Sequence, residues 1–142
     1  MIYGGYSAKS EDDWKLWEGI FNLVHHSLIG REDDDVKKIL SLAKQYKIKI
    51  LTTVNIYDFN KKEINPEMVE KFKNFYKKFG DDPSIFGYGY EAGYRIPKED
   101  QIKIYKTIKS IDPKRPVWLE FSSTSSSTWE KGFNPDACDG IY

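Results

Sequence analysis

Apolar residues recur along this chain in two alternating spacings. Short runs rich in Ile, Val and aromatic residues alternate with longer segments whose apolar residues return every three or four positions, as expected for strands and helices. The helical spacing is clear in Val36, Ile39, Leu40 and Ala43. The pattern predicts strands at residues 2–6, 20–26, 48–56, 85–91, 116–122 and 137–142, with a helix between each pair of the first five strands.

Polar residues indicate where the predicted helices begin. Ser10 is followed three residues later by Asp13, a pair that suits the first turn of a helix. The acidic run at residues 33–35 favours the positive end of a second helix. Asn65, followed by proline, caps a third helix, and Pro97 begins a fourth.

Two α/β folds fit this order of elements. One is an incomplete (β/α) barrel of the TIM type with five to six parallel strands, and the other is an open doubly wound sheet. Strands buried on both faces are almost continuously apolar, whereas these strands contain Asn22, Thr52, Thr53, Asn55, Glu91 and Glu120. No glycine-rich phosphate loop follows the first strand. We therefore expect an incomplete barrel.

The length of the chain sets the expected domain organisation. The chain has 142 residues, whereas a complete barrel needs about 250 residues. The sequence stops within its sixth predicted strand, so we expect a single partial barrel domain over residues 1–142 that belongs to something larger or needs a partner.

The strand at residues 85–91 carries the most informative candidate. Alternation places Ile85, Gly87, Gly89 and Glu91 on one face and the aromatic residues at positions 86, 88 and 90 on the other. A crowded barrel interior suits glycines, and a helix-covered exterior suits large rings. Glu91 then lies at the carboxyl end of the strand on the inner face, where barrel enzymes place catalytic groups.

Composition excludes several classes of function. Lys plus Arg and Asp plus Glu number 22 each, so the net charge is zero and no nucleic-acid footprint is expected. No run approaches the roughly 18 apolar residues of a membrane span. Cys138 is the single cysteine, which excludes an internal disulfide and a cysteine-rich zinc site. We expect no metal and no cofactor, and the lack of a signal-like start favours a cytoplasmic location.

Glu120 and His26 are further candidates for the site. Glu120 could be a second carboxylate beside Glu91, or a glutamate paired elsewhere. His25 and His26 are adjacent, so on a strand they point to opposite faces and cannot easily bind one metal ion. His26 shares a face with Asn22 and is the better candidate for a partner of a ligand hydroxyl, the alternative being a structural histidine.

Aromatic residues make up 15% of the chain. Most have core spacing, but four lie at or near predicted strand tips or loops, where they could either pack against the protein or stack on the ring of a ligand. These four are Tyr57, Tyr94, Trp118 and Trp129. Trp129 follows a Ser/Thr run at residues 122–128, which is either a flexible linker or a substrate-facing loop. Asn55 is a polar residue near a strand tip and is predicted to contact the same ligand.

The segment at residues 81–91, DDPSIFGYGYE, resembles the fourth-strand region of clan A-type retaining glycoside hydrolases, which are (β/α)8 barrels. Residues 19–24, 48–51, 111–117 and 139–142 are similar to other strand regions of that family. The resemblance implies a fold truncated after the sixth strand, with Glu91 as the general acid/base. It also implies a nucleophile on a seventh strand, to which nothing here corresponds. Tyr90 stands where the family has Asn or Asp.

The expected partners follow from the resemblance and from the open sheet. The resemblance implies a carbohydrate ligand, either cleaved or held by a non-catalytic binding or assembly module. Unpaired edge strands invite pairing with another chain. We therefore expect a homo-oligomer or association with the remainder of a barrel.

Overall fold

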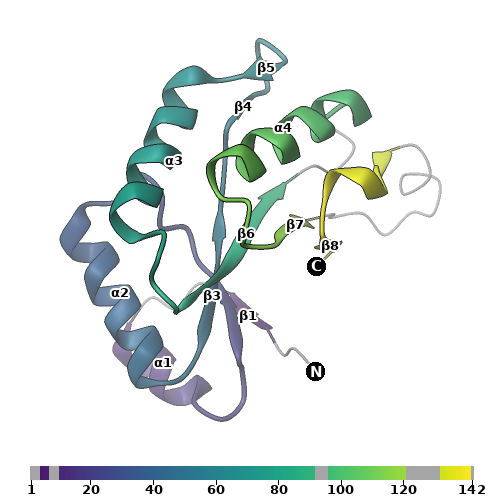
Figure 1. The fold of residues 1–142 in the computed structure, drawn as a ribbon. Helices are drawn as coiled ribbons and strands as arrows, with labels where there is room; N and C mark the ends of the chain where they lie inside the picture. Colours follow the sequence, from purple (N-terminus) through teal and green to yellow (C-terminus); the bar gives the residue numbers. More distant parts are fainter. Residues whose placement is uncertain (1–3, 7–9, 92–95, 121–131, 142) are drawn as a thin grey trace.

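The computed structural model describes residues 4–6, 10–91, 96–120 and 132–141. It has an α/β fold with a curled half-barrel sheet, as predicted (Figure 1). The sheet strands are β1 (Gly4–Tyr6), β2 (Leu23–His25), β3 (Lys49–Thr53), β6 (Ile85–Glu91), β7 (Val117–Glu120) and β8 (Gly140–Ile141). The helices are α1 (Glu11–Trp17), α2 (Asp33–Gln45), α3 (Pro66–Phe79) and α4 (Lys98–Ile111).

The order of the strands distinguishes the two predicted folds. They run β1-β2-β3-β6-β7-β8 across the sheet, and every neighbouring pair is parallel. Right-handed crossovers that always advance in one direction place their helices on one face of the sheet. A doubly wound sheet would instead reverse direction at a switch point. The structure is therefore an incomplete TIM-type barrel, with β1 and β8 at the two edges of the described sheet.

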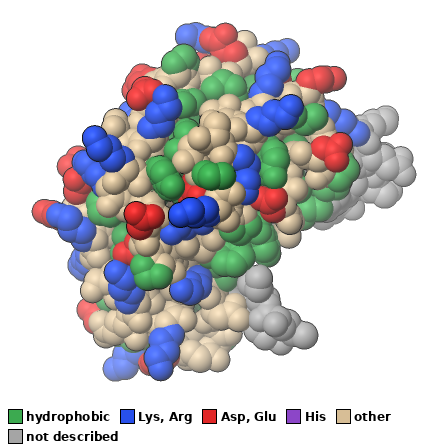
Figure 2. All heavy atoms as spheres, viewed as in Figure 1, with side chains coloured by type: hydrophobic (Ala, Val, Ile, Leu, Met, Phe, Trp, Pro, Cys, Tyr) green, Lys and Arg blue, Asp and Glu red, His purple; other side chains and the backbone are tan. Residues whose placement is uncertain are grey.

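Local signals in the sequence account for the helix boundaries. Ser10 and Asp13 form a reciprocal capping box at the start of α1, as their spacing predicts. Asn65 accepts hydrogen bonds from the backbone N–H groups of Glu67 and Met68 at the start of α3. Figure 2 shows acidic and basic side chains interspersed over the outer surface of the helices.

The hydrophobic core lies between the sheet and the helices. Trp14 from α1, Phe72 from α3 and Ile108 from α4 are fully buried in one cluster. Tyr88 enters this cluster from β6 and packs edge-on against Phe72, with ring centroids 4.9 Å apart. Tyr88 therefore lies on the face of β6 that the helices cover, as predicted for the aromatic residues of this strand.

The alternation along β6 is interrupted near its start. The register with β3 shifts between Ile50 and Leu51, so that Ile50 pairs with Ile85 but Leu51 pairs with Gly87. Because of this irregularity, Ile85 lies in the core beneath the helices. Phe86 instead packs edge-on against Trp118 on the inner face, 5.6 Å away. The predicted faces are correct from Gly87 onward and wrong for Ile85 and Phe86.

A buried ion pair fixes the loop between α4 and β7. Asp112 is fully buried and accepts hydrogen bonds from the Tyr88 hydroxyl at 2.8 Å and from Arg115 Nη1 at 3.0 Å. Arg115 also donates to the carbonyl oxygens of Asp82 and Ile85. Burial raises the pKa of Asp112, but the hydrogen bonds from Tyr88, Arg115 and two backbone N–H groups outweigh it and hold that pKa below its ordinary value.

Two elements were not predicted from the sequence. A short antiparallel hairpin, β4 (Tyr57–Asp58) and β5 (Glu63–Ile64), follows β3. The 3-10 helix η2 (Pro135–Ala137) precedes β8. The hairpin overhangs the carboxyl end of the sheet, so it contributes directly to the candidate site.

Candidate functional site

Two glutamates end neighbouring strands. Glu91 is the last residue of β6 and Glu120 the last of β7, and the two are direct register partners. The preceding residues, Tyr90 and Leu119, are buried on the helix-covered side. Alternation therefore directs both glutamates to the inner face. Parallel strands lie roughly 4.8 Å apart, so the carboxylates can approach each other at the mouth of the half-barrel.

A histidine and a threonine extend this polar group across the mouth. His25 Nε2 on β2 lies 2.6 Å from Thr53 Oγ1 on β3. Burial lowers the pKa of His25, and the negative charge of Glu120 partly opposes this effect. His25 is therefore mostly neutral at neutral pH and can donate one hydrogen bond and accept another.

Aromatic side chains line the inner face below the two glutamates. Trp118 is the register partner of Gly89 and Gly140, and it contacts Phe86. A Cβ atom added at Gly140 would lie 3.1 Å from the Trp118 indole, so the indole lies close over this glycine. Trp118 precedes Glu120 by two residues and lies on the same face. It therefore provides an apolar surface beneath the carboxylates.

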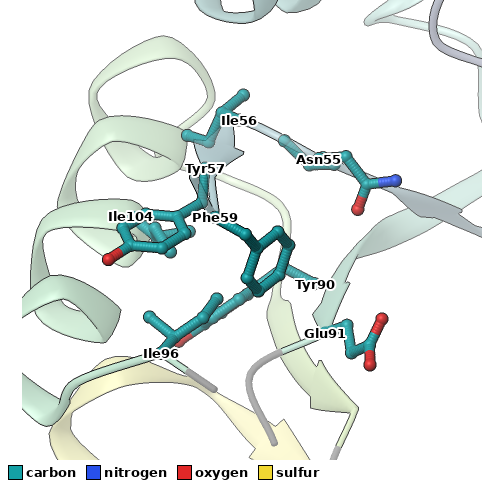
Figure 3. A pocket seen from close by; sticks show the side chains of 9 residues that line it. Asn55, Ile56, Tyr57, Phe59, Tyr90, Glu91, Ile96 and Ile104 are labelled. Atoms are coloured by element: carbon teal, nitrogen blue, oxygen red, sulfur yellow. The ribbon is translucent and has the colours of Figure 1, made fainter. Parts of the chain in front are cut away.

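The hairpin forms a small hollow beside Glu91 (Figure 3). Asn55 and Glu91 direct their polar ends toward the same open side of this hollow. Phe59, at the hairpin turn, is 46% exposed and packs edge-on against Tyr57 with ring centroids 5.5 Å apart. Phe59 thus presents an exposed ring next to the Glu91 carboxylate.

The Tyr57 hydroxyl has a structural partner. It donates a hydrogen bond to Asp100 Oδ2 at 2.8 Å, which ties the hairpin to α4. Burial, together with the hydrogen bond to Asp100 and its negative charge, raises the pKa of Tyr57 to about 12. Tyr57 can therefore contribute its ring to a ligand site more readily than its hydroxyl.

The structure brings together only part of the predicted set. Glu91, Glu120, Asn55, Tyr57 and Trp118 lie along the inner face or its rim. The predicted residues Tyr94 and Trp129 lie outside the described residues.

His26 is a correction to the predicted set. It is 3% exposed and stacks on Trp14 beneath α1, with ring centroids 6.4 Å apart. His25, not His26, lies on the inner face. The neighbouring Val24 is buried in the helix-side core, which sets the orientation of both histidines.

Three residues at the mouth were missed: His25, Thr53 and Phe59. Alternation from the buried Val24 could have identified His25. Thr53 was noted only as a polar strand residue, and Phe59 depends on a hairpin that was not predicted. Within the described residues, no group of three or more His, Cys, Asp or Glu side chains could hold a metal ion. None of the described helices is both long and apolar enough to cross a membrane.

Comparison with known proteins gives structural neighbours only. No protein-family model matches the sequence, and no curated protein matches it. Among solved structures, the chain is similar to a protein assigned as an α-L-fucosidase from Bacteroides thetaiotaomicron, with a TM-score of 0.58 and 13% identity. It is also similar to an FMN-binding β-glucuronidase from Facaelibacterium prausnitzii, with a TM-score of 0.58 and 11% identity. A protein assigned as a β-galactosidase from Bacteroides fragilis has a TM-score of 0.54 and 15% identity.

The shares of each chain that align are unequal. The alignments cover 84%, 97% and 99% of this chain but only 51%, 24% and 22% of the fucosidase, glucuronidase and galactosidase chains, respectively. The chain thus spans about half or less of the proteins that it matches. At these identities the likeness shows a shared fold, a parallel half-barrel of the kind found in glycoside hydrolases.

Proposed function

We propose that this chain forms part of a glycoside hydrolase-like barrel that acts on or binds carbohydrate, with Glu91 as the candidate general acid/base. The observation that carries the proposal is the pairing of Glu91 with Glu120 at neighbouring strand tips on the inner face. The glycoside hydrolase neighbours support the same class of ligand.

The chemistry needs two carboxyl groups. In retaining hydrolysis one carboxylic acid protonates the leaving glycosidic oxygen while a carboxylate roughly 5 Å away attacks the anomeric carbon. Glu91, beside the apolar hollow, suits the first role. Glu120 is the candidate for the second within this chain, whereas the resemblance to clan A enzymes assigns the nucleophile to a seventh strand.

The other residues around the mouth suit recognition of a sugar. Neutral His25 and the Asn55 amide can exchange hydrogen bonds with hydroxyl groups. The faces of Trp118 and Phe59 can stack on the C–H surface of a sugar ring. Tyr94 and Trp129 are proposed to contribute to the same surface.

A non-catalytic carbohydrate-binding module is the second candidate. The observation that favours it is Tyr90, which replaces the Asn or Asp expected before the acid. Tyr90 is 2% exposed, and its hydroxyl donates to the Ala137 carbonyl oxygen at 2.8 Å on the helix side of the sheet. A side chain held in this way cannot contact a sugar at the mouth.

One experiment separates the two candidates. Aryl glycosides of several sugars are screened for turnover at high protein concentration, and binding of the matching free sugars is followed by NMR. Turnover that Glu91→Gln abolishes identifies a hydrolase, and loss of that turnover in Glu120→Gln assigns the second carboxylate. Binding without turnover identifies the module. The carbohydrate proposal is wrong if no sugar shifts the signals of Glu91, Asn55 or Trp118.

A further inference from the structure

A cavity of about 210 Å³ lies between the turn after β2, the end of β3 and the first half of α3. Half of the residues that line it are apolar, namely Ile29, Val54, Ile56, Met68 and Phe72. Val54, Ile56 and Phe72 are at most 2% exposed and form the floor, whereas Ile29 and Met68 are partly buried and form the walls. We refer to this space as the β3–α3 cavity.

Hydrogen bonds hold the walls of the β3–α3 cavity in place. The Leu28 N–H donates to Thr52 Oγ1 at 3.1 Å, which fixes the turn after β2 against β3. The Val54 N–H donates to a carbonyl oxygen of β6 at 2.8 Å, so the backbone pairing continues beyond the end of β3. The Asn65 N–H donates to the Ile56 carbonyl oxygen at 2.8 Å and ties this segment to the start of α3. The cavity is therefore preformed, and a ligand can enter it without the entropic cost of ordering its walls.

The β3–α3 cavity borders the mouth of the half-barrel. Thr53 lines the cavity, and its Oγ1 lies 2.6 Å from His25 Nε2 on the inner face. Asn55 lines both this cavity and the hollow beside Glu91. Figure 3 shows the Asn55 amide directed toward the open side of that hollow. A ligand at the mouth can therefore extend past Asn55 into the cavity.

We propose that the β3–α3 cavity binds an apolar group, such as an aryl ring, that is joined through oxygen to the sugar at the mouth. An apolar cavity of roughly 150 Å³ holds a benzene ring, so a volume of about 210 Å³ is sufficient. The hollow beside Glu91 has only about 20 Å³, which is room for about one water molecule. The preferred ligands are then glycosides with an apolar aglycone. This inference rests on the proposed function, which supplies the sugar.

The charges around the cavity favour a neutral group over an anion. Lys71 lines the cavity, but its ammonium group pairs with Glu67 Oε1 at 2.8 Å. A second cavity of about 180 Å³ lies beside the first, between α2 and α3, and shares Gly30 and Lys71 with it. Among the described residues that line this second cavity, none belongs to a strand. A ligand at the mouth therefore reaches the β3–α3 cavity and not the second one.

Paired ligands and a methyl signal test the proposal. Phenyl and methyl glycosides of fucose, galactose and glucuronic acid, and phenol alone, are titrated into the chain labelled with ¹³C at the methionine methyl groups. The chain has two methionines, Met1 and Met68, so the Met68 signal is easily assigned. We expect a phenyl glycoside to bind about tenfold more tightly than its methyl counterpart, or better, because its ring is buried. The ring should also shift the Met68 methyl signal.

Variants that fill the cavity should remove this preference. Met68→Trp fills it from α3, and Ser27→Phe fills it from the exposed turn on the opposite side. Each should reduce the preference for the phenyl glycoside to less than about twofold, and the second variant covers the case in which the first fails to fold. The matched control is Glu70→Trp, which places the same side chain on the exposed face of α3 and should keep the full preference.

The possible outcomes separate this inference from the proposed function. Equal binding of phenyl and methyl glycosides with an unmoved Met68 signal would overturn the inference and leave the carbohydrate function in place. A Met68 signal that phenol moves although no glycoside binds would confirm the cavity as a site for a ring and disprove the carbohydrate function. A Met68 signal that neither phenol nor any glycoside moves, with no glycoside bound, would overturn both.

Discussion

Replacing Asp112 with asparagine should destabilise the protein more than any surface change. The asparagine Oδ1 can still accept the backbone N–H groups of Lys114 and Arg115, which lie 3.0 and 3.3 Å from Asp112 Oδ1. Its Nδ2 group, however, would face the Arg115 guanidinium, which also donates, at a distance of 3.0 Å in the native pair. The largely buried arginine would then lose its counter-charge.

The size of the effect follows from burial. Removing one partner of a buried ion pair destabilises a protein by about 3–5 kcal/mol. We expect a loss of about 3 kcal/mol for Asp112→Asn because the backbone hydrogen bonds survive. Tyr88→Phe removes only the 2.8 Å bond to the carboxylate and should cost about 1.5–3 kcal/mol. The matched control is Asp34→Asn, which breaks the exposed pair with Lys37 and should leave the free energy of unfolding nearly unchanged.

Urea unfolding followed by tryptophan fluorescence measures all three variants. The depressed pKa of Asp112 means that its stabilisation is present above the ordinary carboxyl pKa and is lost as pH falls through the lower native pKa. Asp112→Asn should therefore also flatten the decline of stability between about pH 5 and pH 2. The assigned role of this ion pair would be refuted if Asp112→Asn had a free energy of unfolding within about 1 kcal/mol of that of the unmodified protein and the same decline of stability at low pH.

Three further predictions concern the mouth and the edges. Burial lowers the native pKa of His25, so the unfolded state binds more protons and the free energy of unfolding should fall as pH drops below about 6.5. His25→Gln should reduce this dependence on pH in urea titrations. An unchanged dependence would contradict the burial assigned to His25. This chain by itself should hydrolyse aryl glycosides poorly, because the resemblance to clan A enzymes places the nucleophile on a seventh strand and the described sheet has six strands. Efficient turnover that Glu91→Gln abolishes would disprove this. The open edges at β1 and β8 should cause self-association at micromolar concentration, and light scattering that reports a stable monomer would count against it.

Sequence patterns predicted the strand order and the position of the main candidate. The bounds of β6 agree with the predicted strand at 85–91, because glycines and aromatic residues alternate there and the break at residues 80–83 separates the strand from α3, which ends at Phe79. Glu91 is consequently where the pattern predicted it, at the open end of the inner face.

The failures have specific physical causes. Two adjacent histidines fit either face equally well, and tertiary packing of Val24 decided the orientation of β2. An irregular register beside Leu51 moved Ile85 and Phe86 to the opposite faces, which no local pattern signals. The hairpin that carries Phe59 has two strands of two residues each, too short for any periodicity to be detected.

The position of Tyr90 limits how this site can change. Its hydroxyl reaches across the core to the backbone of Ala137, and the Gln101 side chain donates to the carbonyl oxygens of Ile96 and Gly132 in the same region. Replacing Tyr90 with the asparagine typical of glycosidases would leave the Ala137 carbonyl without this donor and open a cavity behind β6. The 3-10 helix η2, which ends at Ala137, would be held less firmly as a result. A substitution that brings this strand closer to the glycosidase pattern therefore requires another donor for the Ala137 carbonyl oxygen and another side chain to fill the cavity.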